Sequence, residues 1–208
     1  RLAIRVVDSS ARRGNAAARN IGAAAARGSI LVFIDQDDEA TPRWLSSLVA
    51  CAAGCDVAVG ALPISRDWQR RELDQSSTQA PVNSYGWLPY GLSANMLIRQ
   101  SAFHSLGGFD ESFESATDLD ICWRAQLAGL KFGYCGESVV RKRSKSRGGF
   151  QQHRSFGRDD VQLYQRFRKS GMPRRVTPAI RRIAWLTSRV PMLWQGQVRF
   201  VWVRTFGQ

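Results

Sequence analysis

Hydrophobic and polar positions along the first two thirds of the chain follow the pattern of an open α/β fold. The apolar run at 30–34 is continuous rather than alternating, which is typical of a buried strand in a parallel sheet. An alanine-rich segment precedes this run, and a segment that begins with Thr41 and Pro42 follows it. Both segments predict helices, at 15–27 and 42–53. The sequence therefore predicts a helix–strand–helix unit, from which α/β proteins are built.

Further short elements are predicted on either side of this unit. We expect strands at 1–8, 56–62, 94–98 and 131–135, and helices at 100–106 and 118–128. Residues 65–89 are polar and lack periodicity, which predicts a mobile functional loop.

The predicted strand at 30–34 ends in three carboxylates within four residues, Asp35, Asp37 and Asp38. Acidic residues at the carboxyl end of such a strand lie where open α/β sheets bind ligands. Carboxylates this close repel one another unless a cation joins them. A hard divalent ion that also binds substrate phosphates would satisfy the arrangement. A solvated turn that caps the next helix is the alternative interpretation.

Four sequence motifs occur in order between residues 10 and 135. They are Ala18-Arg19-Asn20-Ile21-Gly22, then Asp35-Gln36-Asp37, then the segments 91–99 and 107–111 (Gly-Gly-Phe-Asp-Glu), and finally Thr117-Asp118-Leu119-Asp120-Ile121-Cys122-Trp123-Arg124 followed by Gly129. An Asp-x-Asp motif alone would be weak evidence. In this order the four motifs resemble those of family 2 glycosyltransferases, which have the GT-A fold.

The resemblance implies a GT-A, Rossmann-like α/β sheet that binds a nucleotide sugar and has helices on both faces. It implies an inverting glycosyltransferase that moves a sugar from a nucleoside-diphosphate sugar to an acceptor hydroxyl, with divalent Mg²⁺ or Mn²⁺ as cofactor. We expect a glycan or a lipid-linked acceptor and a place in polysaccharide biosynthesis. The sequence names neither the sugar, the base nor the acceptor, because specificity in such folds lies in the loops.

On the donor side the resemblance assigns nucleotide-sugar binding to Arg19, Asn20, Asp35 and Asp37, with Asp37 also as the metal ligand. A surface helical arginine is the alternative for Arg19, and a structural role is the alternative for Asn20.

On the acceptor side the resemblance assigns the general base to Asp118, although a carboxylate before an apolar helix can also be only an N-cap. Asp120 and Arg124 are four residues apart and can form a supporting ion pair. Asn95 and Asp110 complete the predicted acceptor-side group.

Three departures from the family pattern accompany these assignments. Thr117 stands where the family has a Glu. The segment 139–143 contains no His, where many relatives have a metal-binding one. We therefore expect either a cationic side chain or His153 to take part of the role of the metal. The family's first βαβ portion is expected to be missing before Arg1, so that the domain is N-terminally incomplete.

The positive charge of the chain is concentrated at its C-terminal end. Residues 1–140 contain 13 Lys and Arg against 15 Asp and Glu, whereas residues 141–208 contain 17 against 2. We therefore predict two domains, a GT-A domain at 1–140 and a basic helical extension at 141–208. A flexible linker is expected at 141–149, and helices at 150–170 and 176–206.

Basic helices that contain Trp are typical of proteins that bind an anionic membrane surface. We therefore expect a cytoplasmic protein that is peripheral at the inner face of the membrane. A helical extension that packs on its own domain is the alternative. Nucleic acid is not expected as a partner, because no recognised binding motif is present.

Two other functions remain open at this stage. One is a non-catalytic membrane-associated or interaction module derived from the same fold. The other is a phosphoryl-transfer enzyme, which would also use paired carboxylates. The four cysteines do not have the spacing of a zinc site, so we expect small buried thiols in a reducing compartment.

Overall fold

The computed structural model describes residues 4–12, 14–65, 82–83, 85–143 and 150–174. These residues belong to two compact units. The first contains residues 1–83, 88–113 and 117–144, and the second contains residues 84–87, 114–116 and 145–208.

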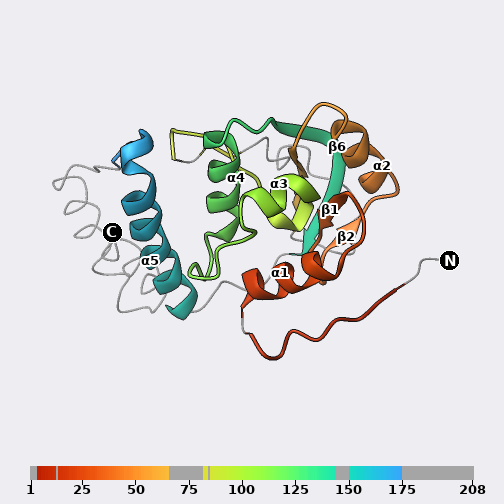
Figure 1. Ribbon diagram of the computed structural model, residues 1–208, viewed down its shortest axis with the longest axis horizontal. Coiled ribbons are helices and arrows are strands. Elements are labelled where there is room, and N and C mark those ends of the chain that lie inside the picture. Colours follow the sequence, from red (N-terminus) through yellow and green to blue (C-terminus); the bar gives the residue numbers. More distant parts are fainter. Residues whose placement is uncertain (1–3, 13, 66–81, 84, 144–149, 175–208) are drawn as a thin grey trace. The chain divides into compact units, whose positions relative to one another are not determined.

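The first unit contains the predicted alternation of helices and strands (Figure 1). Its helices are α1 (Asn15–Ala25), α2 (Trp44–Cys51), α3 (Gln100–Ser105) and α4 (Thr117–Leu127), with a short 3-10 helix at Ser93–Asn95. Its strands are β1 (Ile30–Phe33), β2 (Glu39–Ala40), β3 (Val57–Ala61), β4 (Ile64–Ser65), β5 (Met96–Arg99) and β6 (Phe132–Arg143).

The strands form a mixed sheet in the order β1-β5-β3-β6-β2, with β4 paired to β6. The pairs β3–β6 and β4–β6 are parallel, whereas β1–β5, β3–β5 and β2–β6 are antiparallel. The predicted strand at 30–34 is therefore confirmed, but its expected parallel pairing is wrong, because β1 runs antiparallel to β5. The predicted α/β fold class is confirmed, with a sheet that is mixed.

The core lies around β3 and β5. All five residues of β3 are buried, and Met96, Leu97 and Ile98 of β5 are completely so. Leu48 of α2 packs against this layer. In the same cluster Cys51 of α2 and Cys135 of β6 form a disulfide. The expectation of four free thiols is thus wrong for this pair, whereas Cys55 and Cys122 are free.

Strand β6 is interrupted by a bulge in its pairing with β3. Gly60 lies opposite Cys135, and the next residue, Ala61, lies opposite Val139. A side chain at Gly60 would come within 2.2 Å of Asn95 Nδ2, so the close approach requires glycine. Beyond the bulge β6 continues to Arg143, past the expected domain boundary at 140, and pairs with β2 and β4.

Two other expectations concern the irregular segments. The strand predicted at 1–8 does not form in the described residues 4–8, where Ile4 and Val6 are exposed and pair with no described strand. The greater part of the loop predicted at 65–89, residues 66–81, lies outside the described residues.

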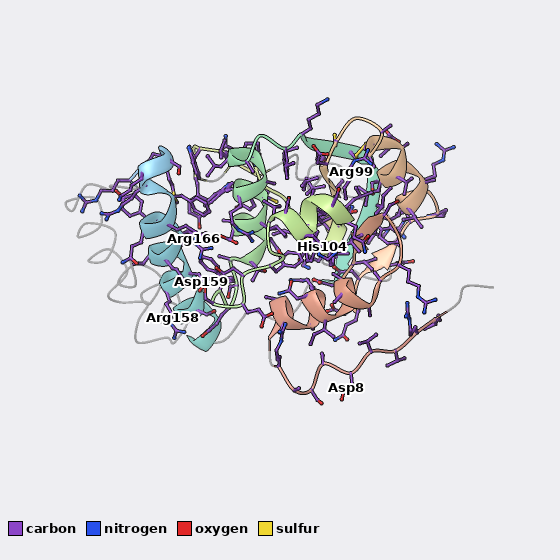
Figure 2. All side chains as sticks on the ribbon, in the orientation of Figure 1. Asp8, Arg99, His104, Arg158, Asp159 and Arg166 are labelled. Carbon is purple, nitrogen blue, oxygen red and sulfur yellow. A yellow bond between two sulfur atoms is a disulfide. The ribbon has the colours of Figure 1, made fainter. Side chains whose placement is uncertain are left out.

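The second unit contains α5 (Phe150–Phe167) and a 3-10 turn at Arg168–Ser170, within the helix predicted at 150–170. The carboxylate of Asp159, labelled in Figure 2, accepts hydrogen bonds from the backbone N–H groups of Ser115 (2.6 Å) and Ala116 (2.9 Å). The helix predicted at 176–206 lies outside the described residues. No helix in the described part of the chain is long and apolar enough to cross a membrane.

Candidate active site

The guanidinium of Arg19 connects the two carboxylates that the sequence placed on opposite sides of a reaction. Arg19 Nη2 donates to Asp35 Oδ1 at 2.9 Å, and Arg19 Nη1 lies 3.7 Å from Asp118 Oδ1. Both pairs are only partly exposed, with 17% of the Arg19 side chain and 13% of the Asp118 side chain accessible. The predicted donor motif and the predicted base therefore lie in one place in the first unit.

The composition of α1 explains why an arginine lies so deep. Ala16 and Ala23 are buried, and Arg19 lies between them on the same helical face. The side chains that flank Arg19 on this face are therefore single methyl groups. The guanidinium of Arg19 then lies 5.6 Å from the ring centroid of Phe109, within the range of a cation–π contact.

The next residue of the motif, Asn20, holds the loop that contains Phe109. Its Nδ2 donates to the Phe109 carbonyl at 2.9 Å and to Glu111 Oε1 at 2.8 Å, and its Oδ1 accepts from the Phe109 N–H at 2.9 Å. Gly108 has φ +76°, and a Cβ at this position would come within 2.8 Å of Asn20 Oδ1. Asn20 thus fixes the loop. This is the structural role that was the alternative to nucleotide-sugar binding for this residue.

The acidic turn after β1 meets a lysine from β6. Lys142 Nζ lies 3.2 Å from Asp35 Oδ2 and 3.3 Å from Asp38 Oδ2. The Asp38 side chain is only 1% exposed, so the ammonium compensates a buried charge. Asp37 lies half-buried in the same turn and also has an interaction partner.

The side chains around this turn do not fit the divalent ion that the resemblance implies. A hard cation takes several oxygen ligands, and one or two carboxylates of the protein are usually among them. No group of three or more His, Cys, Asp or Glu side chains is placed to hold a metal in the described residues. Asp35 and Asp38 are instead paired with arginine and lysine.

Asp118 lies in the first turn of α4, next to the residue that departs from the family pattern. The Thr117 hydroxyl donates to Asp118 Oδ1 at 3.3 Å. Thr117 is buried, so this donor is held in place. At this position the chain therefore supplies a hydrogen-bond donor to the candidate base, where the family has a second acid.

The predicted pair of Asp120 and Arg124 is confirmed. Arg124 Nη2 lies 2.7 Å from Asp120 Oδ2, and the Asp120 side chain is completely buried. Arg124 also donates to the carbonyls of Leu106 and Gly108. The pair therefore ties α4 to the loop that Asn20 holds from its other side.

The remaining acceptor-side candidates have different surroundings. Asn95 is completely buried, and its amide bonds to Trp44 Nε1 (2.9 Å), to the Ala61 carbonyl (3.0 Å) and to the Ser138 carbonyl (2.8 Å). It cannot reach an acceptor and instead supports α2, β3 and the bulge of β6. Asp110 is partly exposed, and its Oδ1 caps the N–H of Ser112 at 2.8 Å.

One cysteine near this site is chemically inert. Cys122 of α4 is completely buried, and burial raises the pKa of its thiol to about 12. Because the thiolate is the nucleophile, Cys122 is not a reactive group at neutral pH.

Sequence reasoning missed Lys142 as an individual site residue, although it left room for a cationic side chain in 139–143. The reason is that the strand was predicted to end at Cys135, and the basic residues at 141–149 were assigned to a linker. The β-branched pair Val139-Val140 is the signal that β6 continues, since such residues favour strands.

Part of the chain is similar in sequence to known proteins. The chain is 36% identical over 135 residues to the pre-mycofactocin glycosyltransferase of Mycobacterium tuberculosis, a match that covers 59% of this chain and 28% of that protein. It is 29% identical over 141 residues to the O-antigen biosynthesis protein RfbC of Myxococcus xanthus, which covers 55% and 11%. The chain thus matches less than a third of the length of either curated relative.

Among solved structures, the mannosyltransferase PcManGT from Pyrobaculum calidifontis, in complex with GDP-Man and Mn²⁺, superposes with a TM-score of 0.57 at 20% identity. The superposition covers 99% of this chain and 56% of that one. This likeness confirms the GT-A fold. The sequence profile described as glycosyl transferase family 2 matches residues 2–107. Because this match covers half of the chain, the chain belongs to glycosyltransferase family 2.

Proposed function

We propose that the domain transfers a sugar from a nucleoside-diphosphate sugar to an acceptor hydroxyl, in a single displacement that inverts the anomeric carbon. The observation that supports this most directly is the double contact of Arg19 with Asp35 and Asp118. A transferase must hold donor and acceptor side by side, because positioning supplies a large part of the rate. One guanidinium within reach of both carboxylates marks the place where the two substrates would meet.

In this proposal Asp118 is the general base. A positioned carboxylate takes the proton from the acceptor hydroxyl as that oxygen attacks the anomeric carbon. The Thr117 hydroxyl and the Arg19 guanidinium both contact Oδ1 of Asp118 and would orient its carboxylate. Asp110, which is partly exposed in the adjoining loop, remains the acceptor-side candidate.

The donor's diphosphate would lie at the acidic turn, with Arg19 as one cationic group beside it. Because PcManGT binds GDP-Man, GDP is the first nucleotide to test. The nucleobase of this chain's own donor is open. A divalent ion with Asp37 as ligand, which the resemblance implies, is the alternative to a protein cation at this turn. Its test is whether nucleotide binding requires added metal.

The first experiment is thermal unfolding of the protein with UDP, GDP or dTDP, each with Mn²⁺ or with EDTA. A ligand that binds only the native state raises the melting temperature. We expect one nucleotide to give the largest shift, and Arg19→Met to reduce it. If no nucleotide shifts the melting temperature under either condition, the proposed function fails.

Location and acceptor are further proposals. The net charge of residues 141–208 supports a cytoplasmic enzyme at an anionic membrane surface that acts on a glycan or a lipid-linked acceptor. Cosedimentation of the protein with anionic vesicles is the measurement that supports or removes this proposal.

A further inference from the structure

The ammonium of Lys142 occupies the position between two carboxylates where the acidic turn would be expected to hold a cation. It is within 3.3 Å of both Asp35 and Asp38. Asp35 is bonded on its other oxygen by Arg19, at 2.9 Å. These two carboxylates therefore face two protein cations.

The register of the sheet places Lys142 there. In the antiparallel pair of β2 and β6, Glu39 lies opposite Arg141 and Ala40 lies opposite Val140. One step further along this register, Asp38 comes opposite Lys142. The backbone N–H of Lys142 also donates to the Pro63 carbonyl at 3.0 Å, which fixes the strand from its other edge. Two strand pairings thus place the backbone of Lys142 beside the acidic turn.

Burial gives this contact a further role. A carboxylate as buried as that of Asp38 requires a compensating charge, because removal of one partner of a buried pair is strongly unfavourable. A divalent ion that took Asp35 or Asp38 as a ligand would have to displace Lys142 or share the site with its like charge.

We propose that Lys142 is the resident cation of the acidic turn and that its ammonium, in place of a divalent ion, meets the diphosphate of the donor. The second half of this statement rests on the proposed function. An ammonium has three N–H donors, and the two carboxylates use two of them. The Lys142 side chain remains 32% exposed, so the third donor can reach an anionic ligand.

A metal-binding experiment tests the first half without any nucleotide. Mn²⁺ binding is measured by titration calorimetry for the wild type, Lys142→His, Lys142→Met and the control Lys131→His, which places the same new ligand on an exposed residue just before β6. We expect Lys142→His to bind Mn²⁺ about tenfold or more tightly than the wild type, because the substitution removes the competing ammonium from Asp35 and Asp38 and adds an imidazole. Lys142→Met should show a smaller gain, and Lys131→His none.

Equal Mn²⁺ affinity in the wild type and both Lys142 variants would overturn the inference. Thermal unfolding of each variant identifies a loss of folding, and Lys142→Met keeps the test usable if Lys142→His does not fold.

A nucleotide experiment tests the second half. With EDTA present, the wild type should bind its preferred nucleoside diphosphate, and Lys142→Met should bind it about tenfold or more weakly, because a charge-assisted contact to phosphate is lost. Binding that requires Mn²⁺ and is unchanged in Lys142→Met would overturn the inference and leave the proposed function intact. Absence of all nucleotide binding would count against the proposed function, while the Mn²⁺ titration would still decide whether Lys142 fills the acidic turn.

Discussion

At the scale of single residues, the site depends on a few cationic side chains that reach across long stretches of sequence. Arg19 contacts Asp118, and Lys142 contacts Asp35 and Asp38, although these partners are about one hundred positions apart in the chain. Each cation bonds carboxylates from more than one motif or position. The arrangement of charge, more than any single acid, defines the candidate site.

Asp118→Asn should abolish transfer and leave nucleotide binding in place. The amide keeps the shape of the side chain but cannot accept the proton of the acceptor, so turnover should fall by about a hundredfold to ten thousandfold. Turnover of the nucleotide sugar and the thermal shift with nucleotide measure the two effects separately. The control Asp8→Asn makes the same substitution on the exposed N-terminal segment seen in Figure 2 and should change neither. Wild-type turnover in Asp118→Asn would remove Asp118 as the base.

Contacts between residues that are close in sequence were predictable, and contacts between distant residues were not. The Asp120–Arg124 pair was predictable because two residues four apart on a helix must be neighbours. The Lys142–Asp38 pair was not, because it depends on how β6 pairs with β2. For Asn95 the sequence supplied a polar residue in a family motif, but only the structure shows that the amide is buried and fully bonded.

At the scale of elements, α4 combines the candidate base with a buried ion pair that anchors the helix. Asp120→Ala should destabilise the protein by about 3 kcal/mol, because it leaves the Arg124 charge without its buried partner. The double variant Asp120→Ala/Arg124→Met should cost less than the sum of the single variants, with a coupling energy of about 1–3 kcal/mol. Urea unfolding of all four proteins measures this coupling.

The exposed pair Arg158–Glu114 is the matched control for this cycle. Both of its side chains are more than half exposed, and such pairs contribute little. A coupling energy as small for Asp120–Arg124 as for the control would contradict the anchoring role of the buried pair.

The buried thiol of α4 predicts a loss of stability at alkaline pH. The pKa of Cys122 is raised to about 12 in the folded protein from 9.0. Above pH 9 the unfolded chain releases this proton while the folded chain keeps it, so the free energy of unfolding falls as pH rises. Relative to pH 8, this group should cost about 2 kcal/mol at pH 10.5.

Cys122→Ala removes that group and should show a correspondingly smaller decline over the same pH range. Urea unfolding at pH 8, 9 and 10.5 gives the comparison. Parallel declines in the two proteins would mean that Cys122 does not titrate as its burial requires.

The elements themselves were largely predictable, and their pairing was not. The helices at α1 and α4 and the strands at β1, β3 and β5 follow from local periodicity, which is present in the sequence. The two-residue strands β2 and β4 and the last half of β6 form only because partners distant in sequence meet. Apart from the β-branched pair Val139-Val140 of β6, their residues have no pattern that distinguishes them from loops.

At the scale of the whole molecule, charge is the property with the clearest consequence. Residues 141–208 contain 17 Lys and Arg against 2 Asp and Glu. We expect the protein to cosediment with vesicles that contain anionic lipid, and to be released when salt shortens the screening length. Vesicles of neutral lipid are the control. Equal sedimentation with both lipids, or none with either, would remove the membrane proposal.

The bulge in β6 has a consequence for how this domain can diverge. Residues 136–138 act as a spacer between the two parts of β6. Because strand side chains alternate between two faces, the length of this spacer decides which face each later residue of β6 occupies. Deletion of one spacer residue, with the pairing of residues 132–135 to β3 and the shape of the bulge kept, would bring position 143 opposite Asp38 and turn Lys142 to the other face. An insertion would bring position 141 there instead. A change of length in this bulge, with no substitution in any motif, would thus exchange the cation at the acidic turn.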